Sequence, residues 1–190
     1  MTAALQSAYP PESEWTTDDL DALPEDGRRR ELLDGVLLMS PSPTRTHQTI
    51  AGHLMAALDE DCPDGYDVTQ AVEVRINRTR SFIPDVLITT AAAAAREPSK
   101  YEPHEVVVAI EIVSPNTRSI DRVLKPALYA QAGIPYYWRI ETEGALEVVT
   151  YRIDAVNEVY TETGRWTKFV DTGEPFPINL PISRITPRVR

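Results

Sequence analysis

The chain has 190 residues, of which 42% are hydrophobic and 25% charged, and its formal net charge is −10. This is the composition of an ordinary globular domain, and no apolar run approaches the roughly 20 residues that cross a bilayer, which excludes a membrane-spanning protein. The one cysteine, Cys62, excludes an internal disulfide and any metal site built from several cysteines.

The acidic residues are concentrated at the start of the chain. Seven of them precede Arg28 with no lysine or arginine among them, so residues 28–190 carry a formal charge of only −3. We therefore predict an acidic lead-in over residues 1–27 and a single domain over residues 28–190. Nucleic-acid binders normally present a basic surface, so the charge weakens that interpretation without excluding it. The start lacks the basic and apolar segments of a secretory signal, and we expect a cytoplasmic location.

Turn and capping residues define the elements in the first half of the chain. Thr16 or Thr17, directly ahead of several acids, predicts a short capped helical turn. Asp34-Gly35 between two apolar runs predicts a hairpin over residues 30–39, because both turn residues must take positive φ. A helix is expected over residues 44–60, where apolar residues form one stripe.

Strands dominate the second half. We expect them at residues 66–76, 82–89, 105–114, 136–140, 146–153, 158–162 and 168–170, with a short helix in the alanine run 91–95. A further helix should end at Ala132, because Gly133 can take the left-handed position after it and Pro135 prevents continuation. Pro126 places the start of its regular part near Leu124.

Two acids interrupt very hydrophobic strands. Glu111 shares one strand face with Val107, Ala109 and Val113, while the other face is wholly apolar, as in a central strand of a covered sheet. Asp85 repeats this pattern directly after Pro84. If the two strands are neighbours, the carboxylates repel each other unless a cation lies between them. Oxygen ligands without a cysteine or histidine cluster favour Mg²⁺ or Mn²⁺.

Lys125 is one of only three lysines and lies near the start of the helix that follows the Glu111 strand. A short connection from strand to helix can fold it back over the end of that strand. Each acid alone could equally be a salt-bridge partner, and Lys125 alone could be a solvated lysine in a first helical turn. The three residues together favour a site.

These residues, in this order, resemble the PD-(D/E)XK nuclease superfamily and, more closely, the Uma-type restriction endonucleases of bacteria. The resemblance covers roughly residues 28 to 155. The matching stretches are residues 30–43, the His47-Gln48 pair, residues 83–86, residues 111–117, and the pattern Asp121, Lys125, Tyr129 and residues 132–138.

The resemblance implies an α/β (α+β) fold with a restriction-endonuclease-like mixed sheet flanked by helices. It also implies that Asp85 and Glu111 are metal ligands, with Glu31 as an additional acid. We expect the Ile112 carbonyl to be a further ligand of the Mg²⁺ or Mn²⁺ ion. The superfamily motif places its lysine two residues after the second acid, where this chain has valine. In the Uma-type pattern the lysine comes from the following helix, and it corresponds to Lys125.

We therefore expect an endonuclease that hydrolyses phosphodiester bonds in DNA. Lys125 would orient or help deprotonate the attacking water and offset phosphate charge. The exposed arginines that could contact phosphates are Arg75, Arg78, Arg80 and Arg118, although such residues are more often simply solubilising. A homodimer follows from the resemblance, because one small domain needs a second copy to cut both strands.

Other interpretations are weaker. The alternative function is a catalytically weak nuclease-fold binding or regulatory module, which the net negative charge supports. Aromatic residues 136–138 could stack on bases, but an aromatic core strand is favoured. His47 and His53 lie six apart on the predicted helix and make no metal pair, and His47 has no role that we can derive. Ser114 lacks the glycine elbow of a serine hydrolase.

Overall fold

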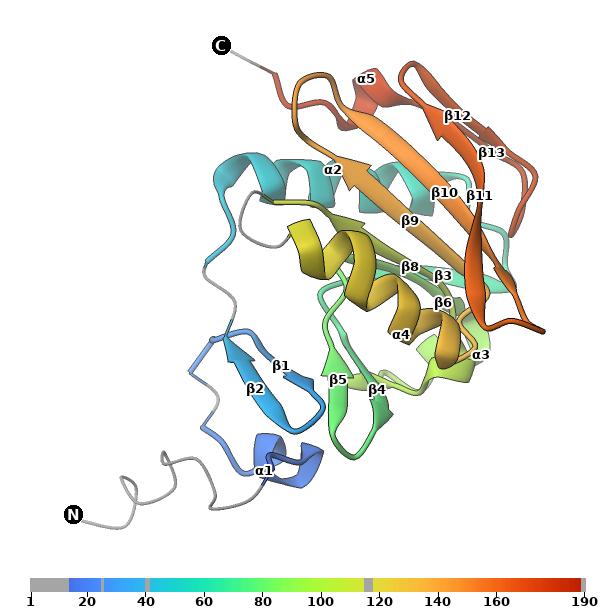
Figure 1. Ribbon diagram of the computed structural model, residues 1–190. Helices are drawn as coiled ribbons and strands as arrows, with labels where there is room; N and C mark the ends of the chain where they lie inside the picture. The colour runs from blue at the N-terminus through green and yellow to red at the C-terminus, as the bar shows by residue number, and fades with distance from the viewer. Residues whose placement is uncertain (1–13, 25, 40–41, 115–117, 189–190) are drawn as a thin grey trace.

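The computed structural model describes residues 14–24, 26–39, 42–114 and 118–188, which form three β-sheets packed against helices (Figure 1). The central six-stranded sheet has the order β11-β10-β9-β8-β6-β3. Its strands are β3 (Tyr66–Gln70), β6 (Val86–Thr90), β8 (Val106–Ile112), β9 (Tyr136–Glu141), β10 (Glu147–Asp154) and β11 (Val159–Trp166). β8 and β9 run parallel and the other neighbours antiparallel, so the sheet is mixed as predicted.

A second sheet has five strands in the order β2-β1-β5-β4-β7. They are β1 (Arg30–Leu33), β2 (Val36–Met39), β4 (Glu73–Asn77), β5 (Arg80–Phe82) and β7 (Lys100–Tyr101). The predicted hairpin is confirmed, since Asp34 and Gly35 have φ values of 49° and 77° between β1 and β2. The third sheet pairs β12 (Phe169–Thr172) with β13 (Ile178–Pro181), a strand that we did not predict.

Two of the expected strands are wrong as single elements, because each is divided between the two larger sheets. The expected strand over 66–76 is β3 followed by β4, and Ala71, with φ 56°, turns the chain from one sheet to the other. The expected strand over 82–89 is likewise β5 followed by β6. Pro84 lies between β5 and β6, where its lack of an N–H group costs no hydrogen bond of either sheet. Asp85 therefore lies where the chain passes between sheets.

Helices cover both faces of the central sheet. Helix α2 (Arg45–Glu60) lies behind it in Figure 1 and buries Ile50, Leu54 and Leu58 together with residues of β13 and α5 (Ile182–Ile185). Helix α4 (Lys125–Gln131) lies in front, where Tyr129 packs with Phe82 of the second sheet. The short helices α1 (Thr17–Asp21), α3 (Ala91–Ala94) and η2 (Pro103–Glu105) lie between strands or ahead of them. No helix of the described residues is long and apolar enough to cross a membrane.

The segment before α4 is a π-helical turn, η3 (Ile120–Leu124). The Lys125 amide donates to the Ile120 carbonyl, five residues back, and Pro126 then occupies the first turn of α4. Such π-turns often lie at functional sites. The end of the helix follows the prediction, because Gly133 has φ 80° and the Ile134 amide reaches back to the carbonyl of Tyr129.

Candidate active site

A cavity of about 570 Å³ is enclosed by the β1–β2 hairpin, the start of α2, the end of β8 and the turn η3. All the site residues predicted from the sequence line it: Glu31, Asp85, Glu111, Ile112 and Lys125. Their side chains are nearly buried, with exposed fractions between 1% and 6%. Strand topology explains the convergence of the two strand acids. β6 begins where antiparallel β8 ends, so Asp85, just ahead of β6, lies beside the last residues of β8.

Lys125 bridges two carboxylates. Its Nζ atom lies 2.9 Å from Oε1 of Glu111 and 3.0 Å from Oε1 of Glu31. The Tyr129 hydroxyl, one helical turn further along α4, donates to the same Glu111 oxygen at 2.8 Å, and the Ile83 amide donates to Oε1 of Glu31. Among the described residues, no donor hydrogen-bonds to Oε2 of Glu31 or Glu111. Each acid therefore has one fixed oxygen and one oxygen left for another ligand.

Asp85 is held by three other donors. Arg29 Nη1 lies 2.9 Å from its Oδ1, and its Oδ2 accepts from the Ile112 amide at 2.8 Å and lies 3.1 Å from His47 Nε2. Burial opposes ionisation of Asp85, but the His47 hydrogen bond, the Arg29 charge and the Ile112 amide together lower its pKa to about 2. Asp85 is thus a fixed carboxylate at neutral pH.

The site holds more negative than positive charge. Burial favours a neutral Lys125 amine, yet the carboxylates of Glu111, Glu31 and Asp121 outweigh it and raise the pKa of Lys125. Lys125 and Arg29 are two basic residues that line the cavity together with the acids Glu31, Asp85, Glu111 and Asp121. Burial and the neighbouring acids Asp85, Asp121 and Glu31 accordingly raise the pKa of Glu111 to about 8 despite Lys125. A further cation in the cavity would relieve this shortage of positive charge.

The donor chemistry suits a hard divalent cation, since carboxylate oxygens are the ligands that Mg²⁺ prefers. Asp85, Glu31 and Glu111 supply such oxygens, two of which have no partner among the described residues. In that part of the chain, however, no three His, Cys, Asp or Glu side chains are gathered closely enough to hold an ion as they stand. The chemistry of these residues therefore suits a divalent cation. Lys125 contacts one oxygen of Glu31 and one of Glu111, and Arg29 contacts one oxygen of Asp85.

Three contributors to the site were not assigned from the sequence. Arg29 and His47 both contact Asp85, from 56 and 38 residues away, and neither separation can be inferred from local pattern. The sequence did contain one signal for Arg29. It precedes Glu31 by two residues, so in an extended chain the two side chains point to the same side. Tyr129 follows Lys125 by four residues on one helix, which places both on one face.

The four arginines proposed for phosphate contacts do not line the cavity, and each is paired with an acid. Arg75 binds Asp21, Arg78 binds Asp18, Arg80 binds Asp34 and Arg118 binds Glu143. The aromatic strand is core, as favoured, because Tyr137 and Trp138 are 0% and 1% exposed.

Comparison with known proteins identifies the family of the chain. Residues 17–172 match the family Uma2, described as putative restriction endonuclease. The chain belongs to the Uma2 family. The match extends over most of the chain and confirms the resemblance found in its motifs. No curated protein matches the chain.

A solved structure extends the Uma2 assignment to the fold. The chain is similar to the crystal structure of a putative nuclease belonging to DUF820 from Anabaena variabilis, with a TM-score of 0.70 and 19% sequence identity. The similarity covers 90% of this chain and 96% of that one. At this identity the likeness concerns the fold alone, and it confirms the predicted mixed sheet flanked by helices. Family and fold are therefore those of restriction-endonuclease-like nucleases.

Proposed function

We propose that this Uma2 chain is an endonuclease that hydrolyses phosphodiester bonds in DNA with the help of Mg²⁺ or Mn²⁺. The observation that carries the proposal is the buried contact of Lys125 with Glu111 and Glu31 at the wall of a cavity that Asp85 also lines. Buried groups of opposite charge are expensive to desolvate and are a poor way to gain stability alone. Their gathering around an accessible cavity favours a catalytic role.

The cation would be held by Asp85, Glu111 and the Ile112 carbonyl, with Glu31 as an additional acid. When bound, it would supply Lewis-acid chemistry, which activates water and offsets the charge that develops on the phosphate. The protein's own contribution is to hold these ligands in place. His47 and the Ile112 amide fix Oδ2 of the Asp85 carboxylate, while Tyr129 fixes Glu111.

Lys125 acts as a charge rather than as a base in this proposal. Its pKa is raised by the surrounding carboxylates, so the side chain remains an ammonium at neutral pH. An ammonium cannot remove a proton from water, but it donates hydrogen bonds and stabilises negative charge on a phosphate oxygen. The sequence hypothesis left both roles open, and the pKa direction favours orientation and charge stabilisation.

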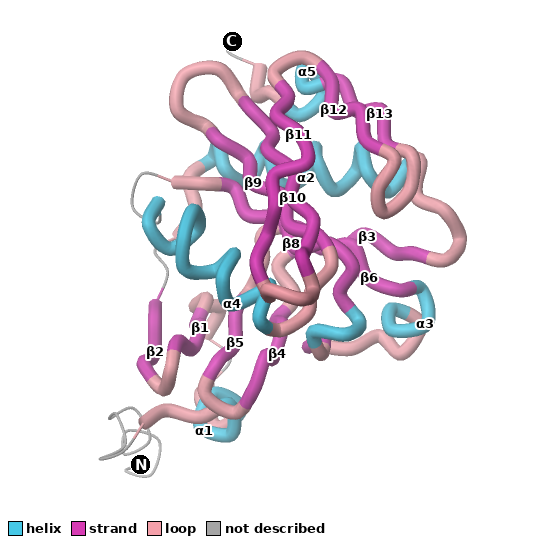
Figure 2. Tube along the Cα trace, turned by 45° about the vertical axis from the view of Figure 1, so that its right-hand side comes forward, coloured by secondary structure: helices cyan, strands magenta, loops and turns pink. Residues whose placement is uncertain are grey.

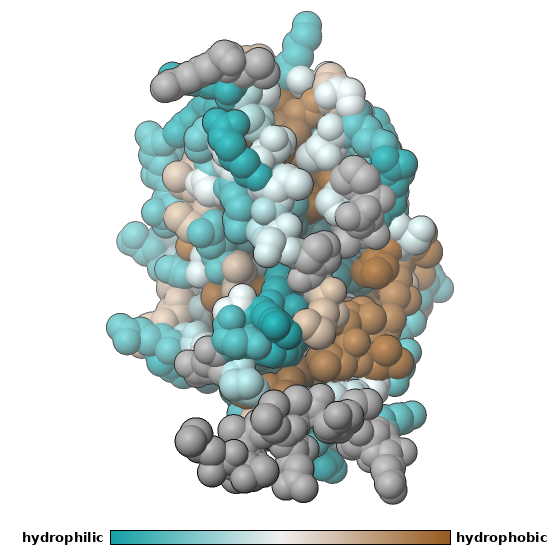
Figure 3. All heavy atoms as spheres, turned by 90° about the vertical axis from the view of Figure 1, so that its left-hand side faces the viewer, coloured by the Kyte–Doolittle hydropathy of each residue, from teal (hydrophilic) through white to brown (hydrophobic). Residues whose placement is uncertain are grey.

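A second copy of the chain completes the proposal, since cutting both strands of a duplex needs two sites. β2 is an edge strand, and β2 and η3 expose Val36, Met39 and Val123 at 57%, 55% and 69%. Figure 3, which shows the side of the molecule where β2 lies, has a broad hydrophobic area on that face. Such an area is typical of a protein–protein contact. A monomer at all concentrations in sedimentation velocity would remove the dimer from the proposal.

The nuclease proposal is tested with purified protein and supercoiled plasmid. We expect nicking or linearisation with Mg²⁺ or Mn²⁺ and none with a chelator. Asp85→Ala and Glu111→Ala should abolish cleavage, whereas Asp171→Ala, which removes an exposed acid on β12, should leave it unchanged. Absence of cleavage by the wild type, or cleavage undiminished in Asp85→Ala, would contradict the proposal.

One observation favours a second candidate, a nuclease-fold module that binds or regulates without catalysis. Arg29 pairs with Asp85, and Lys125 pairs with Glu111 and Glu31. Each of these acids therefore has a basic partner without a further cation. Calorimetric titration separates the two functions. The nuclease should bind Mg²⁺ in a manner lost in Glu111→Ala, and a binding module should show no such binding.

A further inference from the structure

Residues 14–24, here called the lead-in segment, lie across a group of basic side chains. Asp21 binds Arg75 through both of its oxygens and also contacts Lys100 at 3.0 Å. Asp18 contacts Arg78 at 3.2 Å. Figure 2 shows α1 beneath the ends of β4 and β5, the strands that carry or flank these arginines. We name Arg75, Arg78 and Lys100 the covered basic surface.

We infer that the covered basic surface is a binding site for the phosphate backbone of DNA and that the acidic lead-in segment occupies it in the absence of DNA. The inference deepens the proposed function, because it names where the substrate is held and how access is limited. It also accounts for an oddity of the sequence. Candidate phosphate-binding arginines are present, yet acids from far along the chain neutralise them.

The geometry of the contacts is that of anion recognition. The two terminal nitrogens of the Arg75 guanidinium engage the two oxygens of Asp21, the same fork that arginine offers to a phosphate, while its Nε atom donates to Glu73. Lys100 approaches the same carboxylate from the neighbouring strand. A phosphate at the position of the Asp21 carboxylate would meet two cationic side chains from adjacent strands, β4 and β7.

The attachment of the lead-in segment is suited to displacement. Only Thr17 of α1 is buried, and α1 has only five residues. Its backbone is tied to the body at two points, by the Thr17 amide to the Arg78 carbonyl and by the Trp15 amide to the Gly35 carbonyl, each at 2.8 Å. The ion pairs of Asp18 with Arg78 and of Asp21 with Lys100 have exposed partners, and such pairs are weak and screened by salt.

The covered basic surface belongs to the sheet that carries one wall of the candidate active site. Arg75 lies on β4, which pairs with β5, and β5 pairs with β1, the strand of Glu31. A DNA backbone that follows this sheet would reach the cavity. Arg29, which follows the lead-in segment in the chain, lines the cavity.

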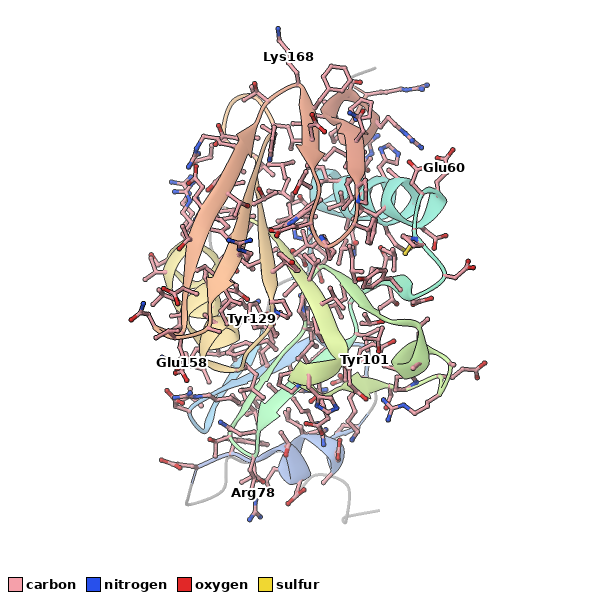
Figure 4. The ribbon with its side chains drawn as sticks, turned by 90° about the vertical axis from the view of Figure 1, so that its right-hand side faces the viewer. Glu60, Arg78, Tyr101, Tyr129, Glu158 and Lys168 are labelled. Atoms are coloured by element: carbon pink, nitrogen blue, oxygen red, sulfur yellow. The ribbon has the colours of Figure 1, made fainter. Side chains whose placement is uncertain are left out.

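The test compares isosteric neutralisation of the cover with matched neutralisation elsewhere. Asp18→Asn/Asp21→Asn frees Arg78 and Lys100, leaves Arg75 paired with Glu73, and keeps the Thr16–Asp19 capping box of α1. The control Glu60→Gln/Glu174→Gln makes the same change in net charge and frees Arg184 and Arg152 instead. Figure 4 shows Glu60 and Arg78 at widely separated places on the molecule. Thermal unfolding by circular dichroism establishes that both double variants are folded.

Binding to a fluorescent DNA duplex is measured in a chelator, from about 50 to 200 mM salt, so that no cleavage is needed. Each additional phosphate contact steepens the plot of log K against log salt by about 0.9. The Asp18→Asn/Asp21→Asn variant frees Arg78 and Lys100, so its slope should be steeper than wild type by about 2. Its affinity advantage should then shrink about tenfold across this salt range. Adding Arg78→Ser/Lys100→Ser should remove both effects.

Three results would overturn the inference. In the first, the Asp18→Asn/Asp21→Asn variant binds the duplex no better than the Glu60→Gln/Glu174→Gln control. In the second, no variant binds the duplex at about 50 mM salt. In the third, polyglutamate competes for the protein as strongly as unlabelled duplex does. The first shows a net-charge effect, the second shows no phosphate site, and the third shows that any polyanion suffices. Because turnover is not measured, these outcomes are independent of whether the chain cuts DNA.

Discussion

Lys125 Nζ and Glu111 Oε1 lie 2.9 Å apart, in side chains that are 5% and 3% exposed. The strand β8 presents Glu111 at its end, and the π-turn η3 brings the start of α4 back over it. Because Glu31 shares the same ammonium, removal of Lys125 leaves two buried carboxyl groups without their positively charged partner. This arrangement leads to the following predictions.

Lys125→Met should lower the free energy of unfolding by about 3 kcal/mol, because Glu111 and Glu31 lose their buried counter-charge. Adding Glu111→Gln should recover part of that loss, since one of the unpaired charges is then absent. Urea unfolding of the wild type, both single variants and the double variant measures the coupling. A Lys125→Met protein as stable as the wild type would show that the pair contributes nothing.

Arg29→Met should tighten Mg²⁺ binding roughly tenfold, because a unit positive charge a few ångströms from the cation is worth at least about 1 kcal/mol. Arg29 contacts Asp85 Oδ1 and thus competes for one of the proposed ligands. Calorimetric titration gives the affinity. Arg184→Met, at an exposed ion pair with Glu60, is the control and should leave Mg²⁺ binding as it is. Weaker binding in Arg29→Met would contradict a cation at Asp85.

Tyr129→Phe should reduce the cleavage rate more than Tyr137→Phe. Both tyrosines are fully buried, and each loses one hydroxyl that donates a hydrogen bond, so each should lose about 1 kcal/mol of stability. Only the Tyr129 hydroxyl contacts Glu111, whereas that of Tyr137 contacts the backbone carbonyl of Asp121. Cleavage assays compare the rates of the two variants, whose losses of stability should be equal. Equal cleavage rates would contradict a positioning role for Tyr129.

The metal-free protein should lose stability as pH rises through about 8. Burial, with the charges of Asp85, Asp121 and Glu31, outweighs Lys125 and raises the pKa of Glu111 from 4.5 to about 8. A carboxyl with a higher pKa in the folded state binds its proton more tightly there, so its contribution is complete below the unfolded pKa and is lost as pH rises through the folded pKa.

Urea unfolding in a chelator at several pH values measures this dependence. Glu111→Gln should flatten the curve between about pH 4.5 and 8, the range between the unfolded and folded pKa values of Glu111, because it removes the titrating group. Glu97→Gln, at an exposed position beyond α3, is the matched control and should leave the slope as in wild type. A wild-type curve that is already flat in this range would show that the acids of the cavity are fully compensated.

Local signals in the sequence were sufficient for much of the fold. Asp34-Gly35 indicated the hairpin, and Gly133 with Pro135 indicated the end of α4, because these residues impose backbone conformations by themselves. The hydrophobic surroundings of Glu111 followed from strand alternation. A bulge at Ile88/Thr89 shifts that alternation at the start of β8, so Val106 packs in the cluster of Ala109, a change that no pattern in β8 itself reveals.

Other features depend on contacts between distant residues and could not be predicted. Ala71 takes a left-handed conformation that alanine alone rarely adopts, so the division between β3 and β4 was missed. The Arg29 and His47 contacts with Asp85 join three separate elements and need the assembled sheets. The ion pairs of Arg75 with Asp21 and of Arg78 with Asp18 likewise form only when the lead-in segment lies against these arginines in the folded protein.

Glu31, Asp85 and Glu111 are proposed to hold one divalent cation beside Lys125. The most direct measurement is anomalous X-ray diffraction from crystals grown with Mn²⁺, with Asp85→Ala crystals as the control. We expect a single anomalous peak in the cavity, bonded to oxygens of Asp85 and Glu111, and its loss in Asp85→Ala. A cavity without a peak at saturating Mn²⁺, or a peak unaffected by Asp85→Ala, would contradict it.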